Sequence, residues 1–125
     1  MGKKNKRPVY LNLLKIRLPV TGVVSFVHRA TGALLVLLLP VALYLLQRSL
    51  QDPAAFAQIA RSAAALPGRL VGLLIVWVFA LHFFSGVRHL LLDVDIGIER
   101  TKARRGAWFT LIAAAVVVLL AGICL

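Results

Sequence analysis

Acidic residues are scarce in this chain of 125 residues, which has four of them against fifteen lysines and arginines, for a formal net charge of +11. So few carboxylates argue against a hydrolase that works with a pair of them. The single cysteine, Cys124, excludes an intramolecular disulfide and is expected to be an inert packing residue. Glycine-rich phosphate loops, CxxC pairs and HExxH motifs are also missing, so the sequence predicts no soluble-enzyme active site.

Charge is missing from three long stretches of the chain. Each is 18 or 19 residues long, and the whole chain is 61% hydrophobic with a mean hydropathy of +0.91. At about 1.5 Å per residue, each stretch can cross the hydrocarbon core of a bilayer. The sequence therefore predicts an all-α membrane protein, a single membrane-anchor domain over residues 1–125. Its three transmembrane helices are expected at approximately 21–47, 69–94 and 107–125.

The basic residues flank the predicted spans, which favours the lipid bilayer and argues against nucleic acid as their partner. They cluster in residues 1–20 and 100–105, whereas the first connection has only Arg48, Arg61 and Arg69. By the positive-inside rule, the N-terminus is then cytoplasmic and the C-terminus periplasmic. The basic arm at 1–20 is expected along the cytoplasmic interface, either as a solvated anchor or as a contact surface for a soluble partner.

Two expectations concern the connections between the spans. The Asp52-Pro53 pair signals the start of a short surface helix, which the Pro67-Gly68 pair is expected to end. Residues 96–106 are expected to form a charged loop.

The second predicted span carries a polar stripe. Residues three and four apart share a helix face, so His82, Gly86, His89 and Asp93 line one side of this helix. Polar groups are costly in a membrane, and this side is therefore expected to face a partner, a cofactor or a water-filled pocket. Gly86 removes bulk one turn from His82, which would let a flat group approach the helix.

A second polar stripe, formed by Ser25, His28, Arg29 and Gly32, lies near the start of the first span. His28, Arg29 and Gly32 follow Ser25 by three, four and seven positions, so we expect all four on one side of the helix. Serine, histidine and arginine together can hydrogen-bond a carbonyl or pair with a carboxylate, which is more than a membrane anchor requires.

Neutral imidazole is a good axial ligand for haem iron, which makes His82 a candidate ligand. A hydrogen-bonded packing contact is the alternative that spacing leaves open. One histidine fills one axial position, so the second ligand would come from His28 or from a partner subunit. His28, Arg29, Arg88 and His89 lie nearer the predicted cytoplasmic surface, where they can neutralise haem propionates.

These motifs resemble those of the cytochrome b large membrane-anchor subunit of succinate dehydrogenase, respiratory complex II. The resemblance is carried by Arg7-Pro8, Ser25-x-x-His28-Arg29-x-Thr31-Gly32 and His82-x-x-x-Gly86-x-Arg88-His89-x-x-x-Asp93. It covers nearly the whole chain, and residues 9–19 are similar to the proteobacterial branch that uses ubiquinone. Two positions depart from the family pattern: Leu92 replaces an aromatic residue or Met, and Asp95 replaces a small residue.

The resemblance implies that His82 ligates haem b, with the other ligand supplied by a second, smaller anchor subunit. It implies that Ser25 and Arg29 line a ubiquinone pocket, and that His28 lies close to that pocket and to the haem propionates. The family's anchor pair holds an iron–sulfur subunit and a flavoprotein subunit at the bacterial inner membrane, so this chain alone is not expected to oxidise succinate. Two alternatives remain: the anchor of a quinol:fumarate reductase, and a non-redox scaffold or transporter component with structural histidines.

Overall fold

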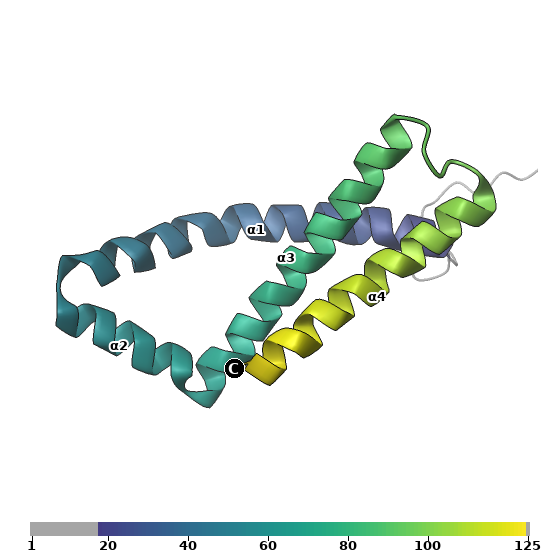
Figure 1. The fold of residues 1–125 in the computed structure, drawn as a ribbon. Coiled ribbons are helices and arrows are strands. Elements are labelled where there is room, and N and C mark those ends of the chain that lie inside the picture. The colour runs from purple at the N-terminus through teal and green to yellow at the C-terminus, as the bar shows by residue number, and fades with distance from the viewer. Residues whose placement is uncertain (1–17, 125) are drawn as a thin grey trace, which may run out of the picture.

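The computed structural model describes residues 18–124, which form four helices and no strand (Figure 1). The helices are α1 (Val20–Gln51), α2 (Pro53–Ala64), α3 (Leu66–Asp93) and α4 (Arg100–Cys124). Three of them, α1, α3 and α4, are long and apolar enough to cross a membrane. The predicted all-α class with three spans is thus confirmed, while the predicted basic arm lies almost wholly outside the described residues.

The helices α3 and α4 run antiparallel and side by side, α1 crosses them, and α2 joins the far end of α1 to the start of α3 (Figure 1). Between α3 and α4, the chain reverses through two residues with left-handed backbones, Asp95 (φ 61°) and Gly97 (φ 82°). Aspartate is one of the few residues other than glycine that adopt this conformation readily. Asp95, which replaces the small residue of the family pattern, is therefore compatible with the backbone conformation of this turn.

The core lies where α1, α3 and α4 meet. Its buried residues are Ala80 and Leu81 of α3 and Ala114 of α4, and the partly buried residues packed on them are Val27, Phe84, Leu111 and Val117. Small side chains at the centre let these helices approach closely. Most of the large hydrophobic residues are exposed nonetheless, Leu37 by 70% and Ile123 by 81%. Lipid or partner subunits must cover these surfaces.

The junction between α2 and α3 confirms one prediction and corrects another. Asp52 caps α2 as expected, because its Oδ1 accepts a hydrogen bond of 2.7 Å from the Ala55 amide. The helix ends at Ala64, however, and Pro67-Gly68 lies inside the first turn of α3 instead of ending α2. Proline is well tolerated in a first turn, where its missing N–H would have no partner in the helix.

The charged loop expected at 96–106 is shorter than predicted, because α4 already begins at Arg100. The basic residues that open α4 are good helix formers, and a helix can extend past the apolar run that crosses the membrane. The sequence shows where the charged residues give way to the apolar run, at Ala107, whereas α4 begins seven residues earlier, at Arg100.

Candidate functional site

All three histidines of the chain gather where α1 crosses α3. The rings of His28 and His82 are stacked, with centroids 4.4 Å apart and planes inclined by 18°. His89, two turns along α3 from His82, lies 5.0 Å from the His28 ring. The three side chains are partly buried. His82, Gly86 and His89 of the polar stripe thus face α1, whereas Asp93 is exposed. We call the histidine cluster, with Thr31, Gly32 and Gly86 around it, the histidine crossing.

The orientation of His82 is set by the backbone of α1. Its Nδ1 lies 3.2 Å from the carbonyl oxygen of His28 and 3.4 Å from Oγ1 of Thr31. A carbonyl oxygen can only accept, so Nδ1 carries the hydrogen in this contact. Thr31 is buried, and its hydroxyl donates to the Val27 carbonyl at 2.7 Å. The consequence is a His82 tautomer whose Nε2 has a free lone pair.

Two glycines make room for the rings. A Cβ atom at Gly32 would lie 2.9 Å from Cε1 of His82, closer than real side chains come, so only glycine fits there without a shift. A Cβ atom at Gly86 would lie 3.3 Å from Nε2 of His28. The space that Gly86 opens on α3 is therefore occupied by the His28 ring, a flat group from α1.

The stacking of His28 on His82 decides what this pair can bind. The lone pair of an imidazole nitrogen lies in the plane of its ring, so two rings lying face to face do not direct their nitrogens at one metal atom between them. Within residues 18–124, no group of three His, Cys, Asp or Glu side chains is placed to hold a metal ion. The arrangement therefore offers one imidazole ligand, from His82, and does not present His28 as its opposite.

Ser25 and Arg29 lie on α1 beside the residues of the histidine crossing. The four residues of this stripe span about 100° around the helix, with His28 at one edge, Arg29 at the other, and Ser25 about 20° from Gly32. Ser25 is partly buried and Arg29 is exposed. One edge of the stripe expected from the sequence, formed by His28 and Gly32, thus contacts His82, while Arg29 at the other edge is exposed.

Arg88 does not join the histidines. Its Nη2 donates a 3.4 Å hydrogen bond to the Ala103 carbonyl of α4, and its Nε lies over Gly106. Residue 88 is six positions beyond His82, about 240° around the helix, which explains why it faces α4 when His82 faces α1. Arg88 and His89 were grouped from the sequence by their depth in the membrane, and the structure separates them.

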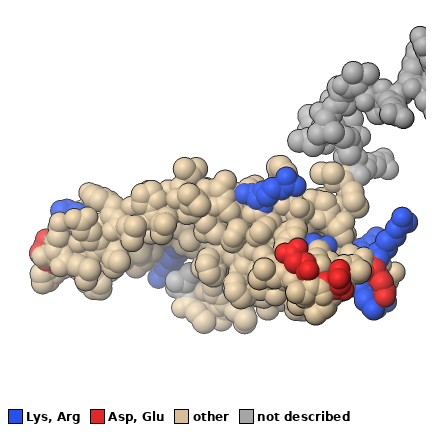
Figure 2. Space-filling view, turned by 90° about the horizontal axis from the view of Figure 1, so that it is seen from above, with Lys and Arg blue, Asp and Glu red and all other residues tan. Residues whose placement is uncertain are grey.

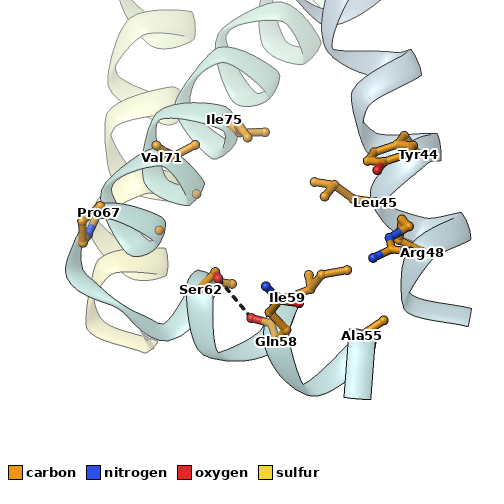
Figure 3. A pocket seen from close by; sticks show the side chains of 13 residues that line it. Tyr44, Leu45, Arg48, Ala55, Gln58, Ile59, Ser62, Pro67, Val71 and Ile75 are labelled. Carbon is orange, nitrogen blue, oxygen red and sulfur yellow. Dashed lines mark hydrogen bonds between the residues drawn. The ribbon is translucent and has the colours of Figure 1, made fainter. Parts of the chain in front are cut away.

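Aliphatic side chains line a cavity of about 620 Å³ between α1, α2 and α3, at the end of the molecule far from the α3–α4 connection (Figure 3). Leu45, Ile59 and Val71 point into it from the three helices, and Arg48 lies at its rim. Arg48 donates to Gln51 at 3.1 Å. The described lining contains no histidine, cysteine or carboxylate, so this α2 cavity offers none of the usual side-chain ligands of a metal ion.

Two polar residues at or near the site were not assigned a role from the sequence. Thr31 stands three residues after His28, a spacing from which its hydroxyl can reach the backbone of the preceding turn, and it also meets His82. Ser85 is fully buried, and its Oγ has no hydrogen-bond partner among the described residues. For Ser85, the signal in the sequence was a polar residue inside an apolar run.

Long apolar helices with a histidine cluster at their crossing define a multi-pass helical membrane protein with an internal imidazole site. The family model of the succinate dehydrogenase/fumarate reductase transmembrane subunit matches residues 3–121, and the chain belongs to this family. The resemblance seen in the motifs is thereby confirmed.

Two curated relatives are similar over nearly their whole length. The succinate dehydrogenase cytochrome b556 subunit of Coxiella burnetii is 30% identical over 122 residues, which cover 94% of this chain and 95% of that protein. The subunit of the same name from Paracoccus denitrificans is 29% identical over 114 residues, covering 91% of this chain and 87% of that protein. Together with the three apolar helices, this makes the chain a multi-pass protein of the bacterial inner membrane.

Proposed function

We propose that this chain is the haem b-binding membrane anchor of a succinate dehydrogenase and forms part of its ubiquinone-reduction site. The observation that carries the proposal is the His82 imidazole, held by its Nδ1–H on the His28 carbonyl with Nε2 left for an iron atom. Metal-ligating histidines commonly donate their other N–H in this way. Both curated relatives are named as b556 subunits of succinate dehydrogenase, which favours it over fumarate reductase.

The described residues fit haem in three respects. His82 would hold the haem iron through Nε2, and Gly32 lets its ring lie against α1 without steric conflict. His28 and His89 gather beside it, where they can donate hydrogen bonds to propionates. Haem b supplies a one-electron iron centre when bound. The role of this chain is to orient the imidazole and to exclude water with the surrounding apolar side chains.

The other axial ligand is assigned to a second, smaller anchor subunit. Because His28 stacks on His82, it is not placed to be that ligand. The broad exposed apolar surfaces of α1 and α3 provide an area for such a subunit. In this proposal the chain is one anchor domain with its N-terminus cytoplasmic, which puts the start of α1 on the side where the iron–sulfur and flavoprotein subunits dock.

Ser25 and Arg29 are assigned to ubiquinone. They share one side of α1 near its beginning, and the exposed Arg29 is accessible to a ligand held between this chain and a partner. The Ser25 hydroxyl donates a hydrogen bond to a quinone carbonyl, and the Arg29 guanidinium stabilises the negative charge that develops during reduction. Succinate oxidation itself takes place in the soluble subunits.

The haem assignment is tested with the dithionite-reduced minus oxidised visible spectrum of the purified complex. We expect His82→Ala to abolish or shift the b-type α band, because the iron loses one protein ligand. Gln58→Ala is the control, since it removes a polar side chain that lines the α2 cavity, away from the histidine crossing, and should keep the band. An unchanged band in His82→Ala would overturn the assignment of this ligand.

The quinone assignment is tested with Ser25→Ala. Losing one hydrogen bond to the quinone should lower succinate:ubiquinone reductase activity roughly tenfold. Succinate oxidation by an artificial acceptor should persist, because the soluble subunits are unchanged. Ser49→Ala, which removes a hydroxyl that donates to the Leu46 carbonyl at the other end of α1, is the control. Equal loss of both activities in Ser25→Ala would contradict the role.

A further inference from the structure

A second cavity, of about 800 Å³, lies at the end of the molecule where α3 joins α4. It is enclosed by the start of α1, the last turns of α3 and the first turns of α4. This volume falls in the range of roughly 300–1,000 Å³ that is typical of ligand sites. Neither the histidine crossing nor the pair Ser25 and Arg29 lines it, so the cavity is separate from the proposed haem and quinone groups.

Three arginines converge on this cavity: Arg88 from α3, and Arg100 and Arg104 from α4. No acidic residue is among its described lining residues. The Nε of Arg88 is buried and has no hydrogen-bond partner among the described residues. The positive end of the α4 dipole, at Arg100, lies at the same place. We call this the arginine cavity.

The carboxylates of the α3–α4 connection do not neutralise the arginine cavity. Glu99 pairs with Lys102 at 3.1 Å on the exposed side of α4. Asp93 and Asp95 are exposed and are not among the residues that line the cavity. Figure 2 shows acidic and basic side chains gathered at this end of the molecule, with fewer charged side chains along the rest of this face.

The rest of the lining is mostly apolar. It includes Ile98 and also Trp108, which lies one turn beyond Arg104 on α4. From Trp108, an exposed apolar track continues along α4 at four-residue spacing through Ile112 and Val116, whose exposed fractions are 58% and 46%. Tryptophan is typical of membrane interfaces, where one side of the ring meets headgroups. The site thus combines a cationic end with an apolar track that runs into the membrane.

We propose that the arginine cavity binds the headgroup of an anionic phospholipid. The phosphate pairs with Arg88, Arg100 and Arg104, and one acyl chain follows Trp108, Ile112 and Val116 along α4. Basic pockets between membrane helices commonly hold anionic headgroups. An acidic protein segment would satisfy the arginines but would leave the apolar track on α4 without an occupant.

The test is a lipid titration of the purified, delipidated complex, followed by native mass spectrometry. Phosphatidylglycerol is the anionic probe and phosphatidylcholine is the zwitterionic one. We expect one phosphatidylglycerol to bind preferentially, and Arg100→Gln/Arg104→Gln to weaken its binding roughly tenfold or more. The control, Arg61→Gln/Arg69→Gln, removes the same charge from exposed arginines at the other end of the molecule and should bind as wild type does.

Several results would overturn the proposal. Equal affinity of the wild-type complex for the two lipids would remove the anionic preference, and unchanged phosphatidylglycerol binding in the double variant would move the site elsewhere. Loss of the soluble subunits with unchanged lipid binding would instead indicate an acidic protein segment at these arginines. If the double glutamine variant does not assemble, Trp108→Ala tests the apolar wall: it should weaken phosphatidylglycerol binding, whereas free phosphate would be unaffected.

Discussion

The same two helices, α1 and α3, meet in opposite ways at the histidine crossing and at the α2 cavity. At the crossing, glycine and buried polar groups bring the backbones together around three imidazoles. At the α2 cavity the helices have separated, α2 spans the gap, and mostly apolar side chains surround about 620 Å³ (Figure 3). The proposed haem ligand lies where the helices are closest, so the proposed site does not coincide with the α2 cavity.

Glycines give this comparison an experimental form, because three of them differ in the space that an added methyl group would enter. A Cβ atom would lie 2.9 Å from its nearest neighbour at Gly32 and 3.3 Å at Gly86, whereas at Gly72, which lines the α2 cavity, it would meet nothing within 4 Å. Alanine at each position adds the same group and the same helix propensity. Differences between the three variants therefore report local packing.

The largest effect is expected for Gly32→Ala. The added methyl group must displace the His82 ring or part α1 from α3, and overpacking of this kind costs about 1–3 kcal/mol. We expect a lower haem content, a shifted b-type band and a lower Tm for the purified complex. Wild-type haem content together with wild-type Tm would show that the contact of Gly32 with His82 does not control the site.

An intermediate effect is expected for Gly86→Ala. The nearest atom is Nε2 of His28, at the end of a side chain that can rotate, so the ring can yield by a few tenths of an ångström. The gain in helix propensity, about 0.5–1 kcal/mol, offsets most of the contact cost. We expect normal haem content and a Tm close to that of wild type. Haem loss as large as in Gly32→Ala would mean that the position of His28 is as critical as that of His82.

How far the sequence alone leads differs between the fold and the site. The spans were predictable because a bilayer requires about 20 apolar residues in a row, and the capping of α2 by Asp52 was predictable from local chemistry. The sharing of one face by His82, Gly86 and His89 also followed from helical spacing. The identity of the helix that this face would meet could not be predicted, because spacing within one helix contains no information about its neighbour.

Arg88 illustrates the same limit. Its place near the membrane edge is evident from the sequence, but its side of α3 decides whether it serves the histidines or the arginine cavity. The angular offset from His82 was available from the six-residue spacing. The approach of Arg100 and Arg104 could not be predicted from the sequence. These residues were expected in a loop, whereas they form the first turns of α4, which brings them to the arginine cavity.

The smallest effect is expected for Gly72→Ala, which tests the open side of the comparison. With no atom within 4 Å, the methyl group enters open space in this chain, and the helix gains about 0.5–1 kcal/mol in propensity. We therefore expect unchanged haem content and an equal or slightly higher Tm. Fluid acyl chains in the α2 cavity would yield to a methyl group, whereas a packed side chain from a partner subunit would not. A fall in Tm as large as in Gly32→Ala would thus show that protein fills this cavity in the assembled complex, and that the two ends of α1 are equally constrained there.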